Sequence, residues 1–207
     1  MRTTAASMCS VLVAMAGVGA AASAQNVLVN PGFESGLSGW TTFGNVFAEP
    51  ITPRTGNGVA KMFGTFSGGF GVSGLFQSFP ANPGETWTMS AFFRHNTGDA
   101  MIGNGPTASN WVVTKFEFRN AADQTISFAE SAPFDGRNAT DIWTPTSASG
   151  TAPAGTVSVW AFFLYLQPQF DGGAVLIDDA SLVPAPGVAG LFGLAGLTLV
   201  GRRRRAN

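Results

Sequence analysis

Residues 86–94 of this chain, TWTMSAFFR, decide its fold class. Trp87, Met89, Ala91 and Phe93 share one face of the segment, and mainly hydroxyl side chains share the other with Arg94. A period of two residues indicates an extended strand with one side in a core and the other in water. We therefore predict a half-buried strand of an antiparallel sheet.

The same alternation recurs along most of the chain. Residues 111–119 and 157–165 are expected to turn inward Val112, Thr114, Phe116, Phe118, Val157, Val159, Ala161, Phe163 and Tyr165. Further strand candidates are residues 27–30, 58–66, 71–79, 125–130, 142–148 and 174–183. Turn-forming sequences, such as NPG at 82–84, separate them. Eight or nine short strands without a helical period predict an all-β fold, an antiparallel β-sandwich of the jelly-roll type.

The composition agrees with short strands and turns. The 207 residues include 27 Gly, 12 Pro and 18 Phe, and only 11% are charged. A single His and a single Cys exclude a zinc ribbon, a zinc finger and an intramolecular disulfide framework.

The first 24 residues have the pattern of a secretory signal peptide. Arg2 gives a charged start, a run of apolar and small residues follows, and A-S-A at 22–24 is a small-residue cleavage site. We expect cleavage between Ala24 and Gln25, which would also remove Cys9. The alternative is an N-terminal core helix, although such a helix would need a polar face.

Residues 184–207 are predicted to be a tail separate from the fold. Pro184 and Pro186 precede an apolar run, 188–201, and four arginines follow it: Arg202, Arg203, Arg204 and Arg205. The run is shorter than the roughly 20 residues of a relaxed membrane span. Arginines after an apolar run act as a stop-transfer signal on the cytoplasmic side.

This layout resembles the PEP-CTERM sorting signal, in which a short proline motif, an apolar helix and an arginine cluster end the chain. The resemblance implies that an exosortase-type membrane protease recognises and cuts the tail, after transient membrane association of the precursor. The family's glutamate between the prolines is Ala185 here, which leaves the identity of the processing enzyme open. A simple C-terminal membrane anchor is the alternative.

The remaining body, residues 25–183, is acidic. Five of the 11 basic residues lie in the two ends and all 12 acidic residues lie between them, so the body carries 6 − 12 = −6 charges. A nucleic-acid binder would need a basic surface, and this class is therefore excluded.

Four motifs spread over residues 27–183 resemble the jelly rolls of carbohydrate-binding modules of the galactose-binding-like kind. The opening NPGFESG at 30–36 is followed by GW at 39–40, and FQSF at 76–79 by PGETWTMS at 83–90. Trp143 precedes APAG at 152–155, and IDDASL at 177–182 resembles the closing strand.

The resemblance also implies a structural calcium ion between Glu34 of the opening motif and Asp178 of the closing strand. Ca²⁺ prefers carboxylate and carbonyl oxygens, and two acids from opposite chain ends would otherwise repel each other. The alternative is that each acid caps a local turn.

A candidate sugar-binding face follows from the polar sides of the strands. Sugars stack on aromatic rings and hydrogen-bond to planar polar side chains. The residues expected to line one sheet are Arg94, Trp111, Lys115, Glu117, Arg119 and Trp160. Trp111 is the first candidate for a stacking platform, while Trp87 and Trp143 are expected in the core. An ordinary solvated face is the alternative.

The sequence gives little support for a catalytic site. His95 is the only histidine and is expected at the surface, and no acidic pair is marked as a glycosidase site. We therefore expect an exported, non-catalytic protein of the cell surface or extracellular matrix, with a membrane-anchored precursor, that contacts polysaccharide. A structural or adhesive protein without a ligand site is the alternative, and a glycan-active enzyme comes third.

Overall fold

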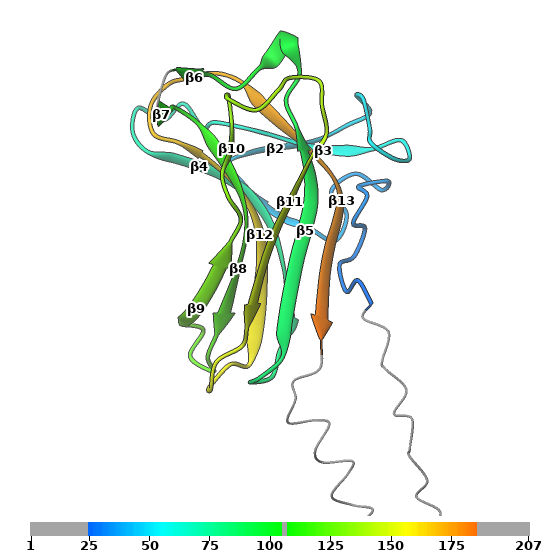
Figure 1. The fold of residues 1–207 in the computed structure, drawn as a ribbon, viewed down its shortest axis with the longest axis vertical. Coiled ribbons are helices and arrows are strands. Elements are labelled where there is room, and N and C mark those ends of the chain that lie inside the picture. Colours follow the sequence, from blue (N-terminus) through cyan, green and yellow to red (C-terminus); the bar gives the residue numbers. More distant parts are fainter. Residues whose placement is uncertain (1–24, 105–106, 186–207) are drawn as a thin grey trace, which may run out of the picture.

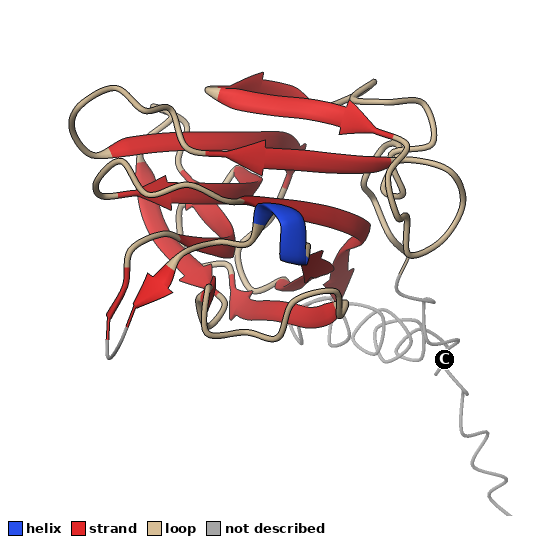
Figure 2. Cartoon of the chain, turned by 90° about the horizontal axis from the view of Figure 1, so that it is seen from above, coloured by secondary structure: helices blue, strands red, loops and turns tan. Residues whose placement is uncertain are grey.

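The computed structural model describes residues 25–104 and 107–185, and these form two facing antiparallel sheets (Figure 1). Seen from above, the strands lie in two layers with loops at their ends (Figure 2). Among the described residues, the helical structure consists of a single 3₁₀ turn, η1 (Thr97–Asp99), and no helix is long and apolar enough to cross a membrane. The predicted all-β sandwich is confirmed. The predicted signal peptide and the tail from Pro186 onward lie outside the described residues.

The first sheet has the order β1-β4-β12-β8-β10, and β9 also pairs with β8. Its strands are β1 (Thr41–Phe43), β4 (Gly71–Pro80), β12 (Ser158–Gln167), β8 (Trp111–Arg119), β10 (Phe134–Asp135) and β9 (Thr125–Glu130). The second sheet has the order β11-β5-β13-β3-β2. Its strands are β11 (Thr144–Thr151), β5 (Thr86–Arg94), β13 (Ala174–Ala185), β3 (Val59–Phe63) and β2 (Asn45–Glu49). A small hairpin joins β6 (Gly103–Asn104) and β7 (Thr107–Ala108).

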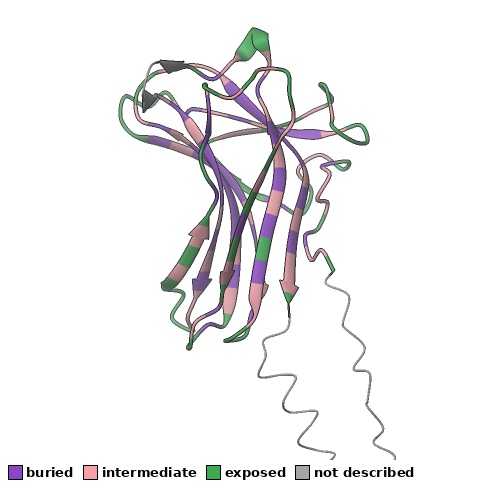
Figure 3. Cartoon of the chain, viewed as in Figure 1, coloured by how far each residue is buried: buried purple, intermediate pink, exposed green. Residues whose placement is uncertain are grey.

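The core lies between the two sheets (Figure 3), and it includes most of the residues that the alternation turned inward, together with loop residues such as Phe33 and Trp40. Trp87, Met89, Ala91 and Phe93 of β5 are each at most 2% exposed. On β8 and β12, Val112, Thr114, Phe116, Phe118, Val159, Ala161, Phe163 and Tyr165 are equally buried. Three details of the prediction are wrong. Trp143, expected in the core, is only half-buried and lies outside the core cluster. Val157 lies outside β12 and is exposed, and residues 27–30 form no strand.

Strand β13 carries Asp178, one of the predicted site residues, at an irregularity in its pairing. Its pairing with β5 shifts register between Asp178 and Ser181, where Asp179 has a positive φ of 48°. Such a bulge bends the strand locally and redirects side chains. The strand continues to Ala185, so its ladder includes Pro184, opposite Trp87.

Candidate functional site

The structure divides the six predicted ligand residues between the two sheets. Lys115, Glu117 and Arg119 project from the outer face of β8, and Trp160 of β12 is the register partner of Glu117. Arg94 lies instead on β5 of the second sheet, where it contacts Asn96 and Asp141. The expectation that all six line one sheet is therefore wrong for Arg94.

Trp111 shares the outer face of β8 but lies at its far end. Eight residues separate it from Arg119, which is about 26 Å along a strand. Its neighbour there is Phe70, whose ring packs edge-on at a centroid distance of 6.1 Å. Trp111 and Arg119 therefore cannot belong to one compact contact.

Glu117 is the centre of an ion cluster on β8. Its carboxylate accepts hydrogen bonds from Arg119 Nη2 at 2.8 Å and Thr125 Oγ1 at 2.8 Å, and Lys115 Nζ lies 3.0 Å from it. Burial by itself would raise the pKa of Glu117, but hydrogen bonds from Arg119, Lys115 and Thr125 outweigh it and the pKa is lowered. Glu117 is therefore an ionised acceptor at neutral pH.

An aromatic row crosses the first sheet beside this cluster, and most of it was missed from the sequence. We define the row as Phe43 of β1, Phe76 of β4, Trp160 and Phe162 of β12, and Phe128 of β9. Ring centroids are 6.5 Å apart for Phe43 and Phe76, and 5.1 Å for Phe76 and Trp160. The alternation could not have found Phe128, because residues 125–130 place it on one face with Ile126, opposite Thr125 and Ser127, which predicts an inward direction. Residues 71–79 have apolar side chains on both faces and give no clear direction for Phe76.

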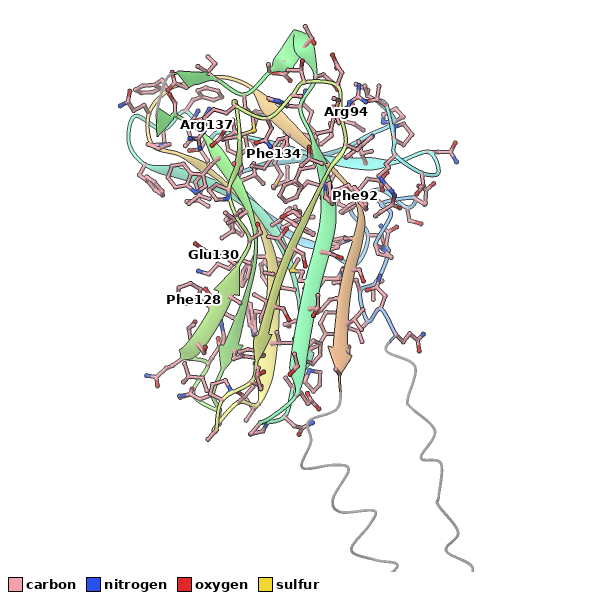
Figure 4. All side chains as sticks on the ribbon, in the orientation of Figure 1. Phe92, Arg94, Phe128, Glu130, Phe134 and Arg137 are labelled. Atoms are coloured by element: carbon pink, nitrogen blue, oxygen red, sulfur yellow. The ribbon has the colours of Figure 1, made fainter. Side chains whose placement is uncertain are left out.

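Both faces of the Trp160 indole are occupied within the protein. Phe76 stacks on the ring at an interplanar angle of 16°, and the Arg119 guanidinium lies 3.9 Å from its centroid. Phe128 is 57% exposed and Phe43 is 38% exposed. Figure 4 shows Phe128 and Glu130 along the same strand, β9. Open aromatic surface is therefore found at the two ends of the row rather than at Trp160.

Glu34 and Asp178 are brought together, as the resemblance implied. Asp178 Oδ1 and Glu34 Oε1 each lie 3.9 Å from the point where a β-carbon on Gly32 would stand. Asp178 is fully buried and accepts hydrogen bonds from the backbone of Arg54, Thr55 and Asp179. Glu34 accepts a hydrogen bond from the backbone N–H of Asn57. Both acids therefore hold the same loop, residues 54–58.

The donor chemistry of this pair suits calcium. Burial raises the pKa of the Asp178 carboxyl, which means that the surroundings do not compensate its charge fully. Within the described residues there is no cluster of three or more His, Cys, Asp and Glu side chains, so further ligands would be backbone carbonyls and water. Hard oxygen ligands of this kind fit Ca²⁺.

His95 is buried, contrary to the sequence prediction of a surface histidine. It is 1% exposed, Nδ1 accepts from the Met101 N–H at 3.1 Å, and Nε2 lies 2.9 Å from the Asn138 carbonyl oxygen. Since Nδ1 is an acceptor, Nε2 carries the proton and donates it. Phe134, labelled in Figure 4, packs edge-on against the ring. Both ring nitrogens therefore hold loops in place.

Comparisons with known proteins identify the fold. No protein-family model matches the sequence, and no curated protein matches it significantly. Solved structures do match. The CBM22-1 xylan-binding domain from Paenibacillus barcinonensis Xyn10C has a TM-score of 0.53 at 17% identity, over 81% of this chain and 99% of that one. A cyclase from Fischerella sp. TAU has a TM-score of 0.56 at 15% identity, over 80% of this chain and 99% of that one.

The enzymatically active domain of tailspike protein 4 from bacteriophage CBA120 is also similar, with a TM-score of 0.55 at 11% identity. The match covers 76% of this chain but only 21% of that one, so this chain spans about a fifth of the tailspike structure. These similarities show the β-sandwich fold of carbohydrate-binding modules. Because enzymes share that fold, it does not by itself assign a function.

Proposed function

We propose that this protein is an exported, non-catalytic polysaccharide-binding protein whose contact surface is the outer face of the first sheet. The observation that carries the proposal is the aromatic row beside the Lys115–Glu117–Arg119 cluster. Sandwiches ordinarily expose polar residues on an outer face, and aromatic side chains gathered there usually mark a contact site. The charged cluster on β8 lies between Trp160 and Phe128 and contacts both rings, through Arg119 and Lys115.

The shape of the row fits an extended chain. It crosses five neighbouring strands, which at about 4.8 Å between strands makes it roughly 19 Å long. A polysaccharide lying across the strands would meet Phe43 at one end and Phe128 at the other. Trp160 would support the middle of the surface indirectly, because its ring packs against the Arg119 guanidinium.

The ion cluster supplies the polar half of such a surface. Arg119 and Lys115 can donate hydrogen bonds to sugar hydroxyls, and Glu117 can accept them. These side chains already hold one another in fixed positions, so little side-chain entropy remains to be lost on binding.

The protonation states of Glu117 and His95 favour a non-catalytic role. A glycosidase needs one carboxylic acid with a raised pKa as its proton donor. The pKa of Glu117 is lowered, and His95 is engaged through both nitrogens. The raised pKa of Asp178 belongs to a fully buried carboxyl on the other sheet, which a sugar could not reach. A structural or adhesive role without a ligand is the competing proposal.

Export and anchoring complete the proposal and rest on the sequence. Residues 1–24 would direct secretion and the tail would be cut by an exosortase-type protease, which places the body at the cell surface or in the extracellular matrix.

We further propose that Ca²⁺ is bound by Glu34 and Asp178 as a structural ion. When bound, the ion would neutralise two carboxylates that come from the two ends of the body. Its effect would be on stability, since the outer face of the first sheet contributes neither of the two acids.

A binding experiment tests the main proposal. The full chain and a Phe43→Ala/Phe128→Ala variant are applied to a glycan array and to immobilised polysaccharides. Phe47→Ala is the matched control, because Phe47 is 48% exposed but lies on the second sheet. We expect the double variant to lose binding and the control to keep it. Absence of binding to every glycan, or equal binding by all three proteins, would contradict the proposal.

A further inference from the structure

Three phenylalanines project into solvent at one end of the sandwich. Phe66 and Phe70 lie in the loop between β3 and β4, and Phe170 lies in the loop between β12 and β13. They are 45%, 60% and 61% exposed. Together with Trp111, on which Phe70 packs, we define them as the aromatic tip. None of them belongs to the aromatic row.

The two loops of the tip are fixed by a buried glutamine. Gln167 has no exposed surface, its Oε1 accepts the Phe66 N–H at 2.8 Å, and its Nε2 donates to the Asp171 carbonyl oxygen at 2.9 Å. The Phe170 ring also lies 3.5 Å from the β-carbon position of Gly68. The tip is therefore a built arrangement in which both loops share one anchor.

Phe66 has a backbone conformation that does not suit a bulky residue. Its φ is +53°, in the left-handed region where glycine or asparagine costs far less. Strain of this kind is retained where the side chain has a function. The Phe66 side chain is largely in water, so this function is not core packing.

The chemistry of the tip favours an apolar ligand over a sugar. Residues 63–73, FGTFSGGFGVS, contain no charged residue, and Asp171 is the only one in residues 168–173. Most polar side chains at the base are engaged: Thr65 Oγ1 bonds to Ser67 Oγ, and both ends of the Gln167 amide are bonded. Asn110 donates to the Asp171 and Gly172 carbonyl oxygens, and its own Oδ1 is buried, away from the tip surface. A sugar site would need polar groups directed at the ligand.

The apolar tail of this chain is not a suitable occupant. β13 begins next to the tip and runs to the opposite end of the sandwich, where the described chain stops at Ala185 (Figure 1). Its 12 residues span about 40 Å. If the residues after about Pro186 are cut from the mature protein, as proposed above, the apolar run 188–201 is removed and cannot cover the tip.

We propose that the aromatic tip inserts into the interface of a lipid bilayer with zwitterionic headgroups. Projecting aromatic side chains have the composition of segments that enter the headgroup and acyl boundary. The charges beside the tip are Asp171 and, next to Trp111, the Asp135–Arg137 ion pair, so the tip carries no excess of positive charge. An anionic bilayer is disfavoured because the body carries −6 charges, from 6 basic and 12 acidic residues.

A fluorophore placed on the tip of the full chain tests the insertion into lipid. Co-sedimentation with vesicles would not do so, because the apolar tail could bind lipid by itself. Ser67→Cys carries an environment-sensitive dye, and Ser149→Cys on β11 is the matched control at another exposed serine. Both are made with Cys9→Ser, so that the label is unique. On adding phosphatidylcholine vesicles, we expect the dye at position 67 to shift to the blue and to be quenched by brominated lipid tails, and the dye at position 149 to stay in water.

Phenylalanine variants then assign the effect. Phe66→Asn/Phe70→Ser should weaken the response at position 67 by more than about tenfold in lipid concentration, since burial of one phenylalanine exceeds a tenfold step. Phe128→Ser, an equally exposed change on β9, should leave it intact. The proposal is overturned if the dye at position 67 stays in water, if the double variant responds like the parent, or if the response appears without vesicles and grows with protein concentration. Mixing phosphatidylglycerol into the vesicles should weaken the response at low salt, and a stronger response would overturn the stated lipid preference.

Discussion

At the scale of single residues, environment decides what each aromatic side chain can do. Trp87 on β5 and Trp160 on β12 both belong to strands in which apolar side chains alternate, but Trp87 faces the core and Trp160 faces outward. Trp87 is 2% exposed in the core, whereas Trp160 is held between Phe76 and Arg119 on the outside. The amino-acid type gives no hint of this difference, and substitutions at the two kinds of position should therefore act on different properties.

Truncation of Trp87 should destabilise the protein strongly. We expect Trp87→Ala to cost about 3–5 kcal/mol of unfolding free energy, as large-to-small changes in cores do. Trp87→Phe should cost less than about 1.5 kcal/mol, because it keeps an aromatic ring and removes a buried N–H group. Within the described residues, that N–H has no hydrogen-bond partner. Urea unfolding followed by circular dichroism measures both, and similar losses for the two variants would refute this account.

Substitutions of Trp111 and Phe128 should distinguish two orientations of a bound polysaccharide, across the strands or along β8. If the chain crosses the strands, Phe128→Ala should weaken binding by about 1–3 kcal/mol, by analogy with stacking on aromatic side chains. Trp111→Ala should then have the smaller effect, and its stability should change by no more than about 0.5 kcal/mol. Isothermal titration against the best glycan measures both. A dominant loss from Trp111→Ala would instead place the chain along β8.

The pKa of Asp178 predicts a pH dependence. Burial raises this pKa above its ordinary value, so the metal-free folded state binds the proton more tightly than the unfolded state does. The stabilising contribution is complete below the ordinary value of about 3.9 and is lost as pH rises through the raised value. The unfolding free energies of the parent and of Asp178→Asn are measured in the presence of a chelator. As the pH falls through this window, we expect the parent to gain stability relative to the variant. A pH-independent difference would be inconsistent with a raised pKa.

At the scale of strands and sheets, close approach between neighbours shapes the binding surface. Gly74 of β4 lies between Phe43 of β1 and Leu164 of β12. A β-carbon there would stand 2.6 Å from Phe43 Cζ and 2.9 Å from Leu164 Cδ2. Glycine at this position therefore lets the Phe43 ring lie over the sheet, at the end of the aromatic row.

Gly74→Val should displace Phe43 and strain β12. We expect a loss of about 1–3 kcal/mol in unfolding free energy, the usual cost of overpacking. Polysaccharide binding should weaken as well. The double variant Gly74→Val/Phe43→Ala should regain part of the lost stability, because the alanine removes the clash. Thermal unfolding and glycan binding of the two variants provide the measurement, and no recovery in the double variant would argue against this contact.

At the scale of the whole molecule, the beginning and end of the body meet in one place. Glu34 and Asp178 both hold the loop around residues 54–58, and the Val27 N–H donates to the Leu182 carbonyl oxygen. A cation bound there would couple the two chain ends, so its removal should be felt by the entire fold.

Chelation should lower the melting temperature of the protein. Binding to the folded state alone contributes about 2.7 kcal/mol when free Ca²⁺ is 100-fold above its dissociation constant. Glu34→Ala should have a lower melting temperature that no longer responds to the chelator, while Glu49→Ala, an acid on β2, should respond like the parent. Identical melting curves of metal-stripped and Ca²⁺-loaded parent protein would reject the site.

The tail should be absent from the mature protein. We expect mass spectrometry of extracellular protein to find no residues after about Pro186, by the sorting-signal resemblance. Replacing the arginines at 202–205 with glutamine should release uncut precursor from the membrane, because the stop-transfer charge is lost. An intact C-terminus on the mature extracellular protein would disprove the processing.

The sequence by itself determined which side of each long strand faces the core. Alternation along residues 86–94 and 111–119 is a local property, since successive side chains of any strand point to opposite faces. The same reasoning gave the all-β class. These features could be predicted because they do not depend on which strands are neighbours, whereas the calcium site at Glu34 and Asp178 stays a prediction.

Only the tertiary structure decided how the faces combine. Arg94 and Lys115 have the same pattern in sequence but lie on different sheets, and Arg119 covers the indole that Trp160 was expected to offer. His95, which follows an alternating segment, is buried because the loop that comes directly after it and the distant loop around Asn138 close over it. Strand pairing joins residues far apart in the chain, and local periodicity carries no information about those partners.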